Sequence, residues 1–318
     1  MDAVPQVIRN ADLRIYYFLS RFAGNWILAR LARFGEENNL LKGGVFFALY
    51  WGIWFRAGVD REKHRKAIIR VLIAAVLSIV VARTIAFLVP FRMRPVDDPG
   101  LVHPSFPIPL QFNLEHWSSF PSDTASYFFA LAFGIAYLSR RFAVPILLYT
   151  SIWICLSRIY LGIHYTSDII AGIAIGIAAA WIALKSTLAQ SIVARPVLMA
   201  EKKPQLFYPI AFLVSFEMAT VFDGLRSLGN AAIHALGIGM HIGFLRTGSS
   251  GPIDTWGGVI AIVACVAVAA WVISASSGGI RSMLAIRRRI GASFGLVSRH
   301  KERIRQVEDI SEDAETLR

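Results

Sequence analysis

Apolar runs about as long as a membrane-crossing helix recur along this chain of 318 residues. A helix needs roughly 20 predominantly apolar residues to cross the hydrocarbon core of a bilayer. The sequence therefore predicts an all-α, polytopic integral membrane helix bundle with about seven spans. The expected spans are Leu41–Phe55, Ala67–Pro90, Asp123–Leu138, Phe142–Cys155, Ser167–Leu184, Leu206–Val221 and Val259–Ser274.

The composition agrees with a membrane protein and argues against nucleic acid as a partner. Hydrophobic residues make up 55% of the chain and charged residues 17%, which is far from the usual globular balance. The net charge is +12, but the lysines and arginines lie in short loops and in the C-terminal tail rather than in one aromatic-interleaved patch. The two cysteines, Cys155 and Cys265, lie far apart inside apolar runs and imply neither a disulfide framework nor a metal site.

The basic loops predict the orientation of the chain, because lysine and arginine collect on the cytoplasmic side of a membrane. The loops containing "RAGVDREKHRKA", "SRR" and "EKK" and the tail containing "RSMLAIRRR" are expected to be cytoplasmic. The connections Phe91–Ser122, Arg158–Thr166 and Asp223–Gly257 then face the opposite compartment. Small residues in "AGIAIGIAAA" predict close packing of the fifth span against a neighbouring helix.

The stretch "SRIYLGIHYTSD" contains a histidine and an aspartate four residues apart, His164 and Asp168. If a helix starts at Tyr165 or just before, both side chains share one helix face, where the carboxylate can accept a hydrogen bond from one imidazole nitrogen. The other nitrogen is then free to act as a nucleophile, for which phosphorus is a natural target. On its own, the pair is equally consistent with an interfacial hydrogen bond.

Arginines near this pair favour a phosphate site. Arg158 belongs to the same stretch, Arg83 lies within the second expected span, and Arg92 and Arg94 follow at its outer end. Arginine binds phosphate bidentately and does not lose its charge, so several arginines together build an oxyanion site. Snorkelling towards the membrane surface is the alternative for Arg83.

The stretch "FPSDTAS" marks the start of the third expected span. Ser122 or Asp123 can cap this helix, and the free backbone N–H groups of its first turn point towards any anion at the mouth. A simple helix cap without an anion is the alternative.

These three stretches, in this order, resemble the type 2 phosphatidic acid phosphatase superfamily of lipid phosphatases and haloperoxidases. Its pattern is a lysine or arginine leading to Arg-Pro, then Pro-Ser-Gly-His, then Ser-Arg, five residues, His, three residues and Asp. Ser157, Arg158, His164 and Asp168 match the third element without a gap. The Pro-Ser-Asp form of the second element is similar to the subgroup acting on bacterial undecaprenyl diphosphate. The resemblance covers about Ala67 to Leu184.

The resemblance implies a role for each matched residue. His164 would be the nucleophile that forms a phosphohistidine, and Asp168 would orient it. The phosphate-binding residues would be Arg83, Arg94, Ser122, Thr124 and Arg158, although Arg92 is an alternative to Arg94. No metal or cofactor is implied. The expected partners are a lipid phosphate or diphosphate substrate and membrane lipids, and the expected place is a bacterial inner (plasma) membrane with the site facing the periplasm or outside.

Five regions follow from these assignments. They are an interfacial N-terminal segment (1–40), the first span with a cytoplasmic loop (41–66), the catalytic core (67–188), two additional spans (189–280) and a charged cytoplasmic tail (281–318).

Thr124 stands where the family carries a histidine that protonates the leaving group. A threonine hydroxyl cannot act as an acid near neutral pH. A lipid monophosphate expels an alkoxide, whose conjugate acid has a pKa of about 16, whereas a lipid diphosphate expels a phosphate with a pKa of about 6. The threonine therefore favours a polyprenyl (undecaprenyl-type) diphosphate as substrate.

Alternatives remain open at this point. His103 or His116, with Asp97, Asp98 and Asp123 nearby, is a candidate replacement for the missing acid. The alternative functions are a lipid monophosphate phosphatase, a lipid phosphotransferase, and a noncatalytic protein that binds or transports a lipid phosphate.

Overall fold

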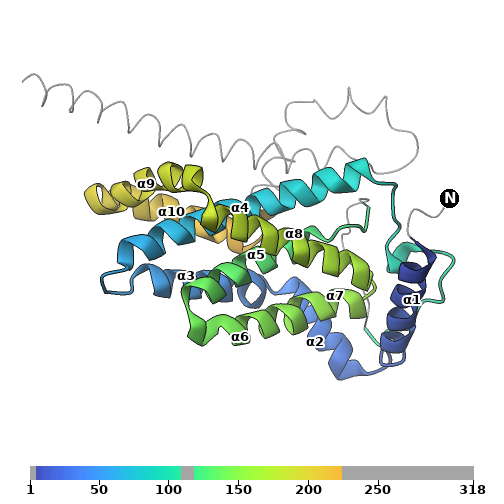
Figure 1. The fold of residues 1–318 in the computed structure, drawn as a ribbon. Coiled ribbons are helices and arrows are strands. Elements are labelled where there is room, and N and C mark those ends of the chain that lie inside the picture. The colour runs from blue at the N-terminus through green and yellow to red at the C-terminus, as the bar shows by residue number, and fades with distance from the viewer. Residues whose placement is uncertain (1–4, 109–117, 224–318) are drawn as a thin grey trace, which may run out of the picture. The chain divides into compact units, whose positions relative to one another are not determined.

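The computed structural model describes residues 5–108 and 118–223, which form helices and connecting loops without strands (Figure 1). All of them lie in one compact unit of the chain, Met1–Ile262. The predicted all-α fold is confirmed for the described residues.

Three described helical segments are long and apolar enough to cross a membrane. They are α4 (Arg61–Leu88), the continuous segment of α6 (Arg140–Tyr149), η3 (Thr150–Leu156) and α7 (Ser157–Tyr160), and α8 (Thr166–Lys185). Two shorter apolar helices are η1 (Leu40–Gly44) with α3 (Val45–Trp54), and α5 (Asp123–Leu138). Five of the expected spans thus recur in these apolar segments and a sixth as a helix described below, but a count of seven spans is not confirmed, and the expected span Val259–Ser274 lies outside the described residues.

The N-terminal segment folds as two helices, α1 (Gln6–Ser20) and α2 (Trp26–Glu37). Asn25 starts the second helix, because its side chain accepts hydrogen bonds from the backbone N–H groups of Ile27 and Leu28. Both helices pack against α7, and α1 also packs against α8. Their expected place in the membrane interface stays a prediction.

Two helices follow α8. α9 (Thr187–Lys202) was not predicted, because its polar residues keep its hydropathy below that of a span. α10 (Pro204–Ala219) coincides with most of the sixth expected span. It ends where Val221 and Phe222 adopt positive φ angles of 54° and 63°, which a right-handed helix cannot contain.

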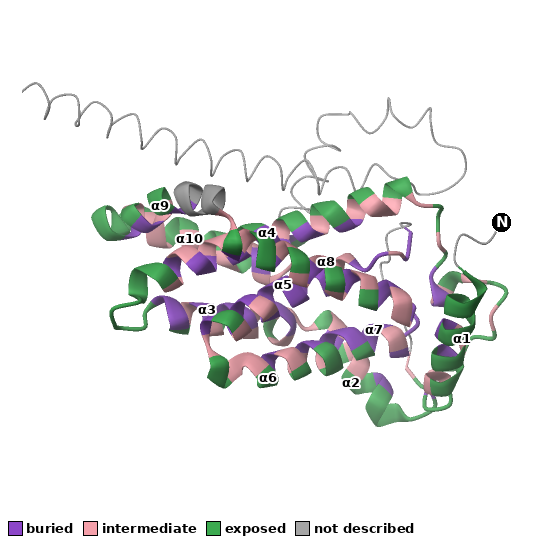
Figure 2. Ribbon diagram, viewed as in Figure 1, coloured by how far each residue is buried: buried purple, intermediate pink, exposed green. Residues whose placement is uncertain are grey.

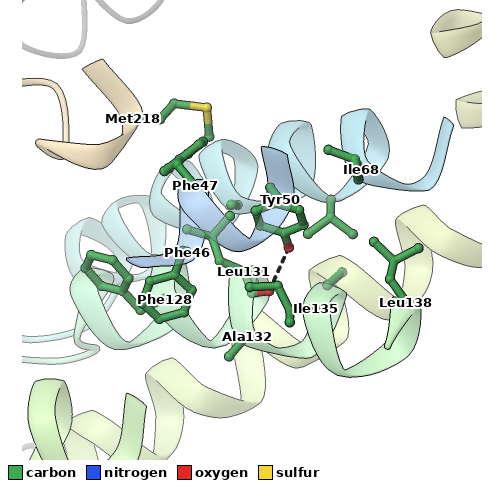
Figure 3. Close-up of a cluster of buried hydrophobic side chains, with 14 of the residues drawn as sticks. Phe46, Phe47, Tyr50, Ile68, Phe128, Leu131, Ala132, Ile135, Leu138 and Met218 are labelled. Carbon is green, nitrogen blue, oxygen red and sulfur yellow. Dashed lines mark hydrogen bonds between the residues drawn. The ribbon is translucent and has the colours of Figure 1, made fainter. Parts of the chain in front are cut away.

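α5 is the central helix of the described unit. It packs against α4, α6, α8 and α3, and 11 of its 16 residues are buried (Figure 2). Tyr50 of α3 donates a hydrogen bond of 2.7 Å to the Leu131 carbonyl of α5 inside the apolar cluster that Figure 3 shows. α5 is therefore held within the bundle by contacts on several sides.

Two glycines of α8 allow its backbone to approach α5. A Cβ atom at Gly176 would lie 2.1 Å from the Ser126 carbonyl oxygen, and one at Gly172 would lie 2.3 Å from that of Ser122. Neither distance is sterically possible, so the predicted close packing through small residues is confirmed.

Gly176→Ala should therefore destabilise the protein, by about 1–3 kcal/mol, because the added methyl group forces α5 and α8 apart. Thermal unfolding of the purified protein in detergent measures this effect. Gly52→Ala on α3 is the control, since nothing lies within 4 Å of a Cβ atom there. Equal unfolding temperatures for the two variants would contradict the packing argument.

Candidate active site

The loop between α7 and α8 carries the imidazole of His164, which is only 2% exposed. This loop turns at Gly162, whose φ of +72° is favourable for glycine. The Gly162 carbonyl accepts a hydrogen bond of 2.9 Å from the Val96 N–H group. That bond ties the chain after α4 to the histidine loop and brings Arg94 next to His164.

The proton position on His164 follows from its partner. Nδ1 lies 2.9 Å from the backbone carbonyl oxygen of Ser119. A carbonyl oxygen only accepts hydrogen bonds, so Nδ1 carries the proton and Nε2 is unprotonated and carries the lone pair. The tautomer is the one that a nucleophilic Nε2 requires.

Asp168 supports the imidazole in a different way from the one predicted. α8 begins at Thr166, so His164 precedes the helix and does not share a helix face with Asp168. The Asp168 Oδ2 atom lies 3.7 Å from Nδ1, beyond hydrogen-bond distance. It accepts instead from the Ser119 hydroxyl at 2.5 Å and from the Tyr165 N–H group at 2.8 Å. Its charge therefore acts on the imidazole across a short gap, while Ser119 makes the direct contact.

Two arginines face the free nitrogen of His164. Arg94 Nη1 lies 3.4 Å and Arg158 Nη2 lies 3.3 Å from Nε2. Both guanidinium groups are buried, and the Nε atom of each has no hydrogen-bond partner within the described residues. Buried N–H groups without partners are costly, and an anion within reach of the two arginines would supply acceptors for them.

The environment keeps His164 neutral. Burial lowers the pKa of His164 to about 4, helped by the positive charges of Arg158 and Arg94 and opposed by Asp168. Burial and the neighbouring Arg158 also lower the pKa of Arg94, although arginine remains charged at neutral pH. The histidine thus offers a lone pair at neutral pH between two cations.

Arg92 does not face His164. Its guanidinium donates hydrogen bonds to Asp168 at 2.5 Å, to the Ser167 hydroxyl at 2.7 Å and to Asp12 of α1 at 2.7 Å. It also stacks over the Tyr165 ring, 4.0 Å from the ring centroid. The sequence did not distinguish Arg92 from Arg94 as the phosphate-binding residue. In the structure Arg94 lies next to His164, whereas Arg92 binds Asp168 and Asp12.

Arg83 pairs with Asp123 rather than contacting His164. Its guanidinium lies 2.6 Å from the Asp123 carboxylate, and both side chains are 23% exposed. The charges of Arg158, His164 and Arg94 also act on Asp123. The Arg83–Asp123 pair therefore borders the cluster, and a role for Arg83 in binding phosphate stays a prediction.

Ser122 and Thr124 make contacts within the first turn of α5. The Ser122 hydroxyl accepts a hydrogen bond of 3.3 Å from the Ala125 N–H group, so Ser122 caps the helix. The half-buried Thr124 donates from its backbone N–H group to Asp123 at 2.7 Å and from its hydroxyl at 3.4 Å. Their expected contacts with phosphate likewise stay predictions.

The candidate replacement acids are not brought beside Thr124 by any described contact. His103 lines a largely apolar cavity of about 280 Å³ with Tyr16, Phe106 and Leu161. His116 lies outside the described residues. Among the described residues, no three His, Cys, Asp or Glu side chains are grouped as metal ligands.

Three residues of the site carried no signal in the sequence. Ser119 is one of several loop serines, and it acts through its carbonyl oxygen as well as its hydroxyl. Asp12 and Glu36 belong to the N-terminal helices, far from the three motifs in sequence. Asp12 binds Arg92 and the Ser167 N–H and hydroxyl groups, while Glu36 binds Arg158.

Part of the chain matches a known protein family. Residues 67–192 match the PAP2 superfamily. This segment contains the predicted residues from Arg83 to Asp168 but neither Asp12 nor Glu36, so the predicted resemblance is confirmed for the core. The match and the long apolar helices together support a membrane protein.

Two known proteins are similar to this chain. "Putative undecaprenyl-diphosphatase YbjG" from Escherichia coli (strain K12) is 28% identical over 116 residues, which are 36% of this chain and 53% of that protein. The chain therefore spans about half the length of this curated relative. A transmembrane PAP2-type phosphatidylglycerolphosphate phosphatase from Bacillus subtilis is 18% identical, with a TM-score of 0.37 over 56% of this chain and 85% of that one.

The low pKa of His164 predicts a loss of stability in acid. The unfolded chain gains a proton on this histidine near its ordinary pKa of about 6.5, whereas the folded protein does so only near 4. Its contribution is therefore complete above pH 6.5 and is lost as the pH falls towards 4, which amounts to about 2–3 kcal/mol.

Unfolding of wild type and His164→Asn, compared at about pH 7 and about pH 4.5, tests this linkage. Asparagine does not titrate, and its amide can still donate to the Ser119 carbonyl. The wild type should lose more stability than the variant between the two pH values. Equal losses would show that His164 is not held neutral.

Proposed function

We propose that this protein is a membrane lipid-phosphate phosphatase that hydrolyses a polyprenyl diphosphate, of the undecaprenyl type, to the monophosphate through a phosphohistidine intermediate. One observation carries the proposal: the unprotonated Nε2 atom of the buried His164 lies between Arg94 and Arg158. The match of residues 67–192 to a superfamily of phosphatases supports a hydrolase.

The first step transfers the terminal phosphoryl group to His164. Nε2 attacks the terminal phosphorus, the bond from phosphorus to the bridging oxygen breaks, and the electron pair leaves with the lipid monophosphate. Arg94 and Arg158 stabilise the negative charge on the transferred oxygens. The imidazole becomes positively charged, and the Ser119 carbonyl and the Asp168 carboxylate stabilise it from the Nδ1 side.

The second step returns the free enzyme. Water attacks the phosphorus of the phosphohistidine, the bond from phosphorus to nitrogen breaks, and its electron pair returns to Nε2. Inorganic phosphate leaves, and the proton lost by the water passes to bulk solvent or to the phosphate product. The same two arginines hold the phosphoryl oxygens during this step.

Thr124 supports a diphosphate rather than a monophosphate substrate. The lipid monophosphate released from a diphosphate is stable as an anion, with a pKa of about 6, so it leaves without a proton donor. The resemblance to an Escherichia coli protein named as an undecaprenyl-diphosphatase agrees with this choice. We place the site on the periplasmic or outer face of a bacterial plasma membrane, following the basic loops.

His164→Ala should lower the rate of phosphate release by at least about 10³-fold, because it removes the nucleophile. The measurement uses purified protein in detergent with undecaprenyl diphosphate and no added metal. His103→Ala is the comparison, since His103 lines the cavity beside Leu161 and makes no described contact with His164. Equal activity of wild type and His164→Ala would exclude the phosphohistidine, and a large loss in His103→Ala would indicate that His103 supplies a proton.

Thr124→His should improve hydrolysis of a monophosphate selectively. A general acid contributes about 10²–10⁴-fold where the leaving group needs a proton. The ratio of kcat/KM for phosphatidic acid to that for undecaprenyl diphosphate should therefore rise by about 10²-fold. A wild-type protein that already prefers phosphatidic acid would contradict the leaving-group argument. One that releases phosphate from neither lipid would favour a noncatalytic lipid-phosphate binding protein.

A further inference from the structure

Glu36 of α2 contacts an arginine of the site although it lies outside the matched segment 67–192. Its Oε1 atom accepts hydrogen bonds from Arg158 Nη1 and from Lys42 Nζ, the latter at 2.9 Å. We propose that Glu36 is a positioning residue that holds the Arg158 guanidinium in the orientation required to bind a phosphoryl group beside His164. This inference rests on the phosphate chemistry proposed for His164.

The geometry of the guanidinium group gives Glu36 this role. The group is planar and rigid, so a contact that fixes one nitrogen also fixes the direction of the other two. With Nη1 bound to Glu36, Nη2 lies 3.3 Å from His164 Nε2, and Nε remains buried without a partner. An anion beside His164 can thus bind N–H groups on Nη2 and Nε, while Nη1 is occupied by the Glu36 carboxylate.

Glu36 also offsets repulsion between cations. Arg94 and Arg158 approach the same nitrogen atom at 3.4 Å and 3.3 Å, and Lys42 is buried on the other side of Glu36. Burial alone would raise the pKa of Glu36, but Arg158 and Lys42 outweigh it and lower the pKa below its usual value. The carboxylate is therefore ionised, and it keeps two like charges together before any substrate binds.

The packing of α2 brings the carboxylate to this place. A Cβ atom at Gly35 would lie 3.2 Å from the Trp153 carbonyl oxygen of η3. This tight approach sets α2 directly against the helical segment that leads to Arg158, and η3 is a π-helix, a form frequent at functional sites. The N-terminal helices are thus part of the site rather than an accessory to it.

Lys42 provides the matched control. It shares the Glu36 carboxylate and also donates to the Glu36 backbone carbonyl at 3.0 Å. Lys42→Met therefore disturbs the same buried network but leaves the Glu36–Arg158 contact in place. A purely structural role of Glu36 would make the lysine and glutamate variants equally harmful.

The experiment measures two properties of purified, full-length protein in detergent. The first is the Kd of inorganic phosphate, measured by calorimetry, and the second is kcat and KM for undecaprenyl diphosphate. Glu36→Gln should weaken phosphate binding by about tenfold, because a charge-assisted contact to Arg158 is lost. It should lower kcat more than it raises KM, since Arg158 acts chiefly on the transferred phosphoryl group. Lys42→Met should change the phosphate Kd by less than about threefold.

Glu36→Asp keeps the test decisive if Glu36→Gln does not fold. Aspartate preserves the negative charge of the buried network but withdraws the carboxylate by one methylene group. Phosphate binding should weaken in this variant while the unfolding temperature stays close to that of wild type. Wild-type phosphate affinity in both Glu36 variants would overturn the inference, as would equal losses in Lys42→Met and Glu36→Gln.

The binding measurement separates this inference from the proposed function. If the wild type binds phosphate but hydrolyses no lipid, a weaker Kd in the Glu36 variants still supports the positioning role and only the proposed reaction fails. If the wild type hydrolyses the lipid and the Glu36 variants match it in every measurement, only the positioning role fails. Failure of the wild type to bind phosphate would overturn the inference as well.

Discussion

The buried carboxylate of Asp168 is the contact on which the rest of the site depends. It is fully buried, and a buried charge is tolerated only when it is paired and hydrogen-bonded. Its hydrogen bonds come from Arg92 after α4, Ser119 before α5 and the Tyr165 N–H group at the start of α8. Satisfying this one charge therefore brings three distant segments together, and the imidazole of His164 lies where they meet.

The sequence predicted the fold class and the main residues of the site better than it predicted their contacts. Apolar length located α4, α5 and α8, since hydropathy is a local property of the chain. The spacing of His164 and Asp168 indicated that they lie close together, but it did not show that the helix begins after the histidine. Only the structure shows which of Arg92 and Arg94 faces His164, because the two arginines lie close together in sequence and differ in their tertiary contacts.

Ser119, Asp12 and Glu36 show why the remaining contacts could not be predicted. The Ser119 carbonyl fixes the tautomer of His164, but it is a backbone group that every residue carries. No sequence pattern therefore identifies it. The two acidic residues lie on amphipathic helices, where a carboxylate usually faces solvent, and only tertiary packing places them next to arginines. α9 was missed for a related reason, since its polar residues lower its mean hydropathy below the value by which spans were located.

The pairing of Asp12 with Arg92 and of Glu36 with Arg158 has a consequence for biosynthesis. Both carboxylates are synthesised before Arg92 and Arg158, and although Lys42 closely follows Glu36, neither charge network is complete until these arginines have been made. Formation of these two ion pairs thus waits for the segments that carry Arg92 and Arg158, and in the matched core without its first helices Arg158 would lose the Glu36 carboxylate while Arg92 would keep that of Asp168.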